Sequence, residues 1–217
     1  MVHKLMLGLV LLGFGSGALA EGRAIAIKAG ALGLGVEYTH ELTDRIAVRG
    51  GLNGSSLGYS DERSGISYDF DLVWDSLTVG IDFHPLKTAF RVSGGILGNH
   101  NRLDAVSRPV TDIVVGNTTY TPDEVGTLTA RVSFAHTSPF VGVGWDWSRK
   151  KRRHFGMSFD LGVLDQGKPH VSLVGSGTLL GDPAFQADIE AERAQLADSL
   201  SGLNLVPYMT AGFVIRF

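Results

Sequence analysis

Most of the chain after residue 21 alternates between apolar and polar residues, which is the pattern of β-strands with two different faces. From Ile66 to Trp74, every second residue is apolar and most of the residues between are serine or aspartate. The alternation continues from Leu77 to Phe83 with its phase shifted by one residue, and the phase shifts again past Pro139. An inserted residue produces such a shift, so we expect one β-bulge near residues 75–76 and another at the proline.

The same alternation recurs along the rest of the chain, which predicts an all-β protein. It returns near Ile46, Phe90 and Leu128, and further strands are expected over about 155–163 and from residue 205 to the end. Short turns join some of these strands, and long connections join others. Short turns on one side and long loops on the other are typical of a transmembrane barrel. The short turns are residues 42–45, 84–88 and 148–153, and the long connections are residues 106–126 and 165–204.

One short helix is expected within the second long connection. Asp182 is a favourable N-cap, Pro183 suits the first helical position, and Gly202 can close the helix. Four apolar residues fall on one face at helical spacing, and we expect this face to pack on a neighbouring surface, with partner binding as the alternative. These residues are Phe185, Ile189, Leu196 and Leu200.

The longest apolar run covers residues 5–20, follows Lys4 and ends in Ala-Leu-Ala, the small-x-small pattern of a signal-peptidase site. Three glycines interrupt this run, and it is shorter than the roughly 20 residues that a spanning helix needs. We therefore predict a cleaved signal peptide over residues 1–20 and an exported domain over residues 21–217. An N-terminal membrane anchor is the alternative.

Composition agrees with an exported β protein. The chain has 29 glycines and no cysteine, so disulfides, thiolate metal sites and cysteine nucleophiles are excluded. Its mean hydropathy of +0.13 is high for a soluble enzyme. Apolar residues that are spread over one face of many strands account for this value without a spanning helix.

The C-terminal strand, residues 209–217, carries apolar residues on one face and ends in Phe217. In a soluble protein this would be a poorly protected edge. Together with several glycine-rich segments, it makes the chain resemble small bacterial outer-membrane β-barrels of the opacity-protein or surface-antigen type. The segments that carry the resemblance are residues 28–38, 82–85, 138–145 and 159–163.

The resemblance implies a closed antiparallel transmembrane β-barrel of about eight strands, located in the bacterial outer membrane as a monomer. It also implies contacts with outer-membrane lipids and lipopolysaccharide, and recognition of the C-terminal strand by the barrel-assembly machinery. The physics is consistent, because a closed barrel pairs every backbone group and crosses a bilayer without an apolar helix. Side chains fill the lumen of so small a barrel.

Two topologies give the even strand number that periplasmic chain ends require. In the first, residues 24–42 form one strand and residues 170–175 form another. In the second, the first segment folds as a hairpin near Gly30, and all short turns become periplasmic. We favour the second because short periplasmic turns are the usual pattern.

Charged residues on the strand faces opposite the apolar ones are expected inside the barrel. An arginine or lysine that faces lipid at mid-depth costs roughly 2–4 kcal/mol. Both signs occur, which predicts an internal network, and we favour a closed plug over a narrow polar path. The expected members are Glu37, Arg49, Asp69, Asp71, Arg91, Arg131, Asp160 and Arg216, and the expected aromatic girdle residues are Trp74, Phe83, Trp145, Trp147 and Phe217.

The densest charge cluster is a run of five cations. Two interpretations of this run are open, a contact with lipid headgroups and a plain solvated turn. Nucleic-acid binding does not fit, because the run is isolated and the net charge is −3. The run consists of Arg149, Lys150, Lys151, Arg152 and Arg153.

His136 and Ser138 are the one arrangement that resembles a catalytic site, because residues two apart on a strand share a face and a few outer-membrane lipid esterases use this pair. No orienting carboxylate is identifiable, and the histidine spacing predicts no metal or cofactor site. The leading function is therefore a structural or surface-interaction scaffold that displays residues 106–126 and 167–204. A narrow conduit for small molecules is the alternative, and a lipid-modifying enzyme is a remote third.

Overall fold

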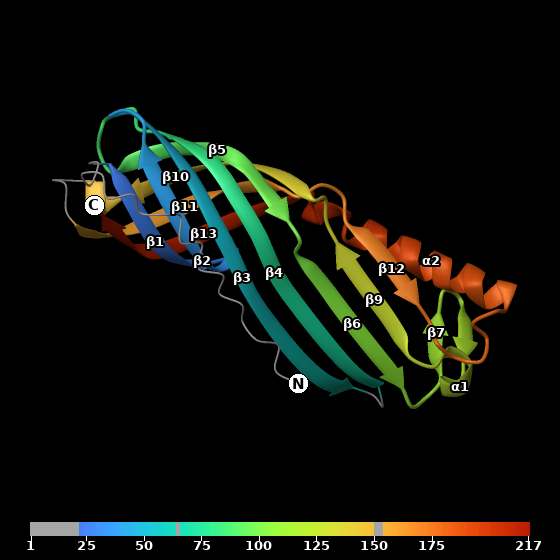
Figure 1. Cartoon of the computed structure of the whole chain (residues 1–217). Coiled ribbons are helices and arrows are strands. Elements are labelled where there is room, and N and C mark those ends of the chain that lie inside the picture. Colours follow the sequence, from blue (N-terminus) through green and yellow to red (C-terminus); the bar gives the residue numbers. More distant parts are fainter. Residues whose placement is uncertain (1–21, 64–65, 150–153) are drawn as a thin grey trace.

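The computed structural model describes residues 22–63, 66–149 and 154–217, and eight of its strands form a closed antiparallel barrel. Each strand pairs with the next, and β1 pairs with β13 to close the ring (Figure 1). The predicted fold class is therefore confirmed. The barrel strands are β1 (Arg23–Gly30), β2 (Gly33–Glu41), β3 (Ile46–Arg63), β4 (Ile66–Phe83), β5 (Phe90–Asn99), β10 (Thr137–Asp146), β11 (Phe155–Asp165) and β13 (Leu205–Arg216).

β3 and β4 have 18 residues each and continue the sheet beyond the barrel. There, β4 pairs with β6 (Arg102–Pro109), β6 pairs with β9 (Leu128–Ser133), and β9 pairs with β12 (His170–Val174). We call this part, with residues 55–63 of β3 and 66–73 of β4, the sheet extension. It accounts for much of the sequence that was expected to be loop.

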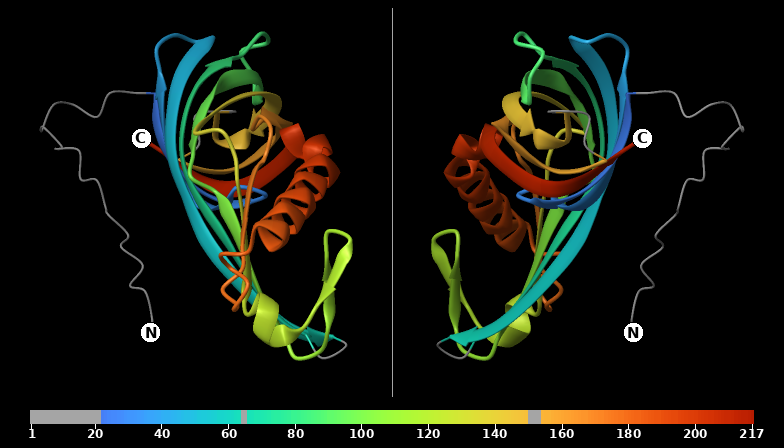
Figure 2. Two further views of the ribbon diagram at one scale, coloured as in Figure 1. Left: turned by 90° about the vertical axis from the view of Figure 1, so that its right-hand side faces the viewer. Right: turned by 90° about the vertical axis from the view of Figure 1, so that its left-hand side faces the viewer.

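Two helices and a small hairpin accompany the sheet extension. α2 (Pro183–Ser199) lies along its concave side, and β7 (Ile113–Val115), β8 (Thr118–Tyr120) and α1 (Pro122–Val125) lie at its far end (Figure 2). The Asp182 carboxylate accepts hydrogen bonds from the backbone N–H groups of Ala184 and Phe185, at 2.8 and 3.1 Å. Phe185 and Ile189 pack in one buried cluster with Val115, Tyr120 and Val125. The helix was predicted with its N-cap and packing face, whereas it ends at Ser199, before Gly202, and α1 was missed.

The connections follow the second topology. β1 and β2 form a hairpin with its turn at residues 31–32. The turns at residues 42–45 and 84–88, the end of β10 and the start of β11 lie at the opposite end of the barrel from the sheet extension (Figure 1). The C-terminal residue reaches the same end, because Arg23 N donates to the carbonyl of Phe217 at 3.2 Å. We call this the short-turn end.

The structure contains neither predicted bulge. The β3–β4 pairing runs without interruption from Ile46 opposite Phe83 to Arg63 opposite Ile66, and Pro139 pairs with Ile96 inside a continuous ladder. The apolar residues of β4 lie on the outer face of the strand within the barrel and on the inner face within the sheet extension. Different faces of the strand are covered in these two parts. In the barrel Leu77 points outward, whereas Leu72, five residues away on the same strand, lies on the face that continues the barrel interior.

The barrel therefore has an apolar outside and a polar inside. Its outer surface carries a continuous set of exposed large apolar side chains, which we call the apolar belt. This inversion of a soluble protein's pattern is the arrangement that contact with lipid requires. The belt includes Ile27, Val36, Val48, Leu52, Leu77, Val79, Ile81, Val92, Ile96, Val141, Leu161, Met209, Phe213 and Ile215. Within the described ranges, no helix is both long and apolar enough to cross a membrane.

Candidate functional site

Six charged side chains meet inside the barrel and form what we call the central network. Each projects inward from a different strand, three are cations and three are anions, and their formal charges cancel. None of the six side chains is more than 13% exposed. The members are Lys28 on β1, Glu37 on β2, Arg49 on β3, Asp82 on β4, Arg91 on β5 and Asp160 on β11.

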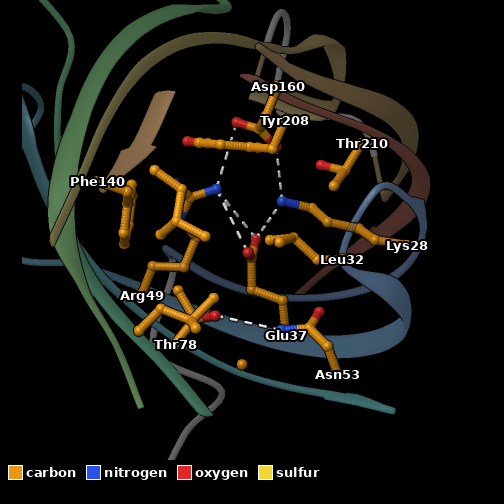
Figure 3. A pocket seen from close by; sticks show the side chains of 13 residues that line it. Lys28, Leu32, Glu37, Arg49, Asn53, Thr78, Phe140, Asp160, Tyr208 and Thr210 are labelled. Carbon is orange, nitrogen blue, oxygen red and sulfur yellow. Dashed lines mark hydrogen bonds and ion pairs between the residues drawn. The ribbon is translucent and has the colours of Figure 1, made fainter. Parts of the chain in front are cut away.

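Asp160 is the centre of this network. Its carboxylate accepts from Lys28 Nζ at 2.8 Å, from Arg91 Nη2 at 2.7 Å and from Arg49 Nη1 at 3.3 Å. Figure 3 shows the contacts with Lys28 and Arg49. Glu37 contacts two of the same cations, with its oxygens 2.6 Å from Lys28 Nζ and 3.3 Å from Arg49 Nη1. Each cation thus contacts at least one anion, so no charge is left alone in the low-dielectric interior.

Asp82 and a glycine hold the other side of the network in place. Asp82 accepts from Arg49 Nη2 at 3.2 Å and from Ser93 Oγ at 2.6 Å. Gly144 provides the room, because a Cβ there would lie 2.4 Å from Asp160 Oδ1 and 2.9 Å from Arg91 Nε. The absence of a side chain at Gly144 therefore lets the Arg91 side chain and the Asp160 carboxylate share one level of a narrow barrel.

An apolar plug closes the barrel toward the sheet extension. Leu32, in the β1–β2 turn, packs against a buried cluster, in which the rings of Phe140 and Tyr208 meet edge to face at 6.0 Å. A cavity of about 40 Å³ is lined by both the plug and the central network (Figure 3). Roughly three water molecules fit in such a volume. The apolar plug comprises Leu32, Leu97, Phe140, Leu164 and Tyr208.

A second group of charges, which we call the end cluster, fills the short-turn end. Arg216 contacts Glu41 at 2.5 Å and Asp146 at 2.8 Å. Arg149 contacts Glu41 at 3.3 Å, and its Nη1 lies 3.1 Å from the ring of His84. Burial, and then the positive charge of Arg149, lower the pKa of His84 to about 4, so this imidazole is neutral at pH 7.

The structure brings together four of the eight residues expected in the interior, and it adds two that the sequence analysis missed. Glu37, Arg49, Arg91 and Asp160 lie in the central network, and Arg216 lies in the end cluster. The missed residues, Lys28 and Asp82, also alternate with outward apolar neighbours. Strict application of the two-residue period would have found both of them.

Three expected interior residues lie elsewhere. Asp69, Asp71 and Arg131 are on the sheet extension, on the face opposite its apolar residues. Asp69 accepts from Ser60 Oγ at 2.6 Å and pairs with Arg108, and Arg131 Nε donates to Asp104 at 2.5 Å. The expectation was wrong because β4 and the strands beside it continue past the barrel, where the polar face meets water.

The expected girdle residues divide in a similar way. Phe83 is exposed on the barrel's outside, and Trp145 packs between Phe90 and Phe159, with ring centroids 5.6 and 6.2 Å away. Trp147 and Phe217 also lie at the short-turn end. Trp74 differs, because it lies three residues from outward-facing Leu77 and therefore on the opposite, inner face of β4.

The basic run is described only at its first residue. The Arg149 side chain is 10% exposed and points into the end cluster, where Nη2 also donates to the carbonyl of Asp44 at 2.8 Å. This placement contradicts its expected role as a headgroup contact. Lys150, Lys151, Arg152 and Arg153, like the predicted signal peptide over residues 1–20, lie outside the described residues.

His136 and Ser138 do not form a catalytic pair in the structure. Ser138 is fully buried, and its Oγ accepts from Asn99 Nδ2 at 3.4 Å. The ring of His136 lies against that of His100, with centroids 5.7 Å apart. The described part of the chain also contains no cluster of histidine and carboxylate groups that could hold a metal ion.

Comparison with solved structures shows the same fold. The crystal structure of CarO from Acinetobacter baumannii aligns over 93% of this chain and 100% of its own, at 21% identity and a TM-score of 0.61. CarO2 from the same species aligns over the same shares, at 19% identity and a TM-score of 0.60. Ail, the attachment invasion locus protein of Yersinia pestis, aligns over 90% of this chain and 94% of its own, at 14% identity and a TM-score of 0.38. No protein-family model and no curated protein matches the sequence.

The two CarO alignments place the chain among the small eight-stranded outer-membrane β-barrels by fold. At about one identical residue in five, the similarity to CarO concerns the fold alone and indicates no shared activity.

Proposed function

We propose that the chain is an integral outer-membrane β-barrel that acts as a closed scaffold and presents the sheet extension for contacts at the cell surface. The observation that carries this proposal is the filled interior. The end cluster, the central network and the apolar plug lie in series along the barrel, and each consists of side chains that pair with or pack against one another. A solute would have to separate buried ion pairs and displace Leu32.

The placement of the connections supports a direction in the membrane. Short turns of transmembrane barrels usually face the periplasm and long connections face outward. We therefore place the short-turn end in the periplasm and the sheet extension outside the cell. Export by the predicted signal peptide, and recognition of the strand that ends at Phe217 by the barrel-assembly machinery, complete this proposal.

Planar-bilayer conductance of the purified, refolded protein tests the closed scaffold. We expect no reproducible single-channel steps, because the cavity between the plug and the central network has room for only a few water molecules. Leu32→Gly combined with Phe140→Ala removes the side chain at the turn and one of the two aromatic rings of the plug. It serves as a positive control for opening. Reproducible steps from the unmodified protein would contradict the proposal.

A narrow conduit remains the second candidate, and the water-sized cavity with its charged wall is the feature that favours it. Steps from the unmodified protein would support this function in place of the scaffold. A lipid esterase is not part of the proposal, because the Ser138 hydroxyl has no exposed surface from which to attack a substrate.

A further inference from the structure

A polar cleft lies where the barrel meets the sheet extension, and the scaffold function does not use it. Its volume is about 320 Å³, and we call it the junction cleft. Its wall contains two arginines and three histidines, whereas no aspartate or glutamate is among its described lining residues. The basic residues are His100, Arg102, Arg131, His136 and His170.

The sheet itself fixes the spacing of three of these groups, Arg102, Arg131 and His170. Arg102 on β6 is directly opposite Ser133 on β9, and Ser133 is directly opposite His170 on β12. Residues that are paired in this way present their side chains side by side on one face. Arg131 lies two residues from Ser133 and therefore shares that face. These three side chains are thus held by three adjacent strands.

Asp104 anchors both arginines of the cleft, and Asp71 lies directly opposite Asp104 on the same face of the sheet. Asp104 is shared by both arginines, because it accepts from Arg102 Nε at 3.2 Å and from Arg131 Nε at 2.5 Å. Both contacts use Nε, and about half of each arginine side chain is exposed.

These donors suit a phosphate group. The planar guanidinium fork matches the spacing of phosphate oxygens and binds them with charge-assisted hydrogen bonds. An imidazole ring offers at least one N–H donor in either protonation state. A site with two arginines, histidines and the amide of Asn101 can therefore surround an anion with donors from several directions.

The position of the cleft relative to the apolar belt identifies the source of the phosphate. The backbone bond from Asn99 N to the carbonyl of His136, at 2.7 Å, links the β5–β10 and β6–β9 ladders in one register. Arg102 therefore lies on the same face as Ile96, and Arg131 on the same face as Val141, both of which belong to the belt. The cleft lies directly beyond the belt, on the lipid-facing side, where headgroups are found.

We propose that the junction cleft binds the phosphate group of an outer-leaflet lipid headgroup. The proposal rests on the membrane placement given under the proposed function. The acyl chains would lie along the apolar belt, while the guanidinium and imidazole groups hold the phosphate above it. A free phosphate ion would gain only the contacts with the guanidinium and imidazole groups, and none with the apolar belt.

The test uses the full-length mature protein in phosphatidylcholine nanodiscs that contain phosphatidic acid as the phosphate-bearing probe. Native mass spectrometry then measures which lipid stays bound to the protein when the protein is released from the nanodisc. We expect retention of phosphatidic acid over phosphatidylcholine, and a roughly tenfold weaker preference in Arg102→Gln/Arg131→Gln, because two charged hydrogen-bond donors are lost. The matched control, Arg108→Gln/Arg193→Gln, removes the same net charge outside the cleft and should keep the preference.

Three results would overturn the proposal. The first is an unmodified protein without any preference for phosphatidic acid, and the second is an equal loss in the control variant. The third is displacement of the lipid by inorganic phosphate at an equal concentration, which would make a free anion the ligand. Heat-modifiable migration on a denaturing gel separates these results from a failure of the proposed function. A folded, inserted barrel without the preference refutes only the cleft, whereas a chain that does not insert refutes the membrane placement.

Discussion

Asp160→Asn is the sharpest perturbation of the barrel interior. The substitution keeps the shape of the side chain and removes the one negative charge that contacts Lys28, Arg49 and Arg91 together. Three cations are then left with two anions in a region that is almost completely shielded from water. Removing one partner of a buried ion pair typically costs about 3–5 kcal/mol, because the remaining charge is not solvated.

We therefore expect the free energy of unfolding to fall by about 3–5 kcal/mol in Asp160→Asn. Urea unfolding in lipid vesicles, followed by tryptophan fluorescence, measures this change. Lys28→Met in the same background restores a neutral interior, so the double variant should be more stable than Asp160→Asn alone. A loss below about 1 kcal/mol, or a double variant that is less stable than the single one, would refute the mutual compensation of these charges.

Three further outcomes follow from the structure. The pKa of His84 is lowered to about 4 from its usual 6.5, so the unfolded chain binds more protons than the folded protein between these two pH values. The free energy of unfolding should therefore fall by up to roughly 3 kcal/mol as the pH drops through this window. In His84→Gln the free energy of unfolding should depend less on pH over the same range. Gly144→Ala should destabilise the barrel by about 1–3 kcal/mol in urea unfolding, whereas Gly94→Ala, whose added Cβ meets its nearest atom at 3.7 Å, should change stability little. Phe185→Ala should expose the segment around residues 110–127 to protease while heat-modifiable migration stays unchanged. The Phe185 side chain is fully buried in the cluster with Val115, Tyr120 and Val125, and this cluster lies outside the barrel.

The two-residue period of the sequence was enough to predict the barrel, because lipid outside and charge inside leave opposite signatures on alternate positions. It predicted Glu37, Arg49, Arg91 and Asp160 as interior groups for the same reason. The two-residue period separates the two faces of a strand, but it does not show which face lies on the inside of the fold and which on the outside. Leu72 and Leu77 are both apolar, yet one lies on the covered side of the sheet extension and the other on the outer surface of the barrel.

The errors in the sequence analysis share this origin. A change of face at the end of the belt was interpreted as two bulges, and Asp69 and Arg131 were placed inside a barrel that ends before them. The position where a long strand leaves the barrel depends on partners such as β6 and β9, which are distant in sequence. The junction cleft depends on the same pairing of β6, β9 and β12, so no local motif indicated it.

The most direct test of the membrane-spanning barrel is the accessibility of spin labels along β4. The chain has no cysteine, so single cysteines can be introduced and labelled without background. With the protein in lipid vesicles, labels at Val79 and Ile81 should collide with dissolved oxygen, whereas labels at Asp69 and Asp71 should collide with a water-soluble nickel chelate. Equal exposure of all four positions to the nickel chelate would contradict a barrel that crosses the membrane through its apolar belt.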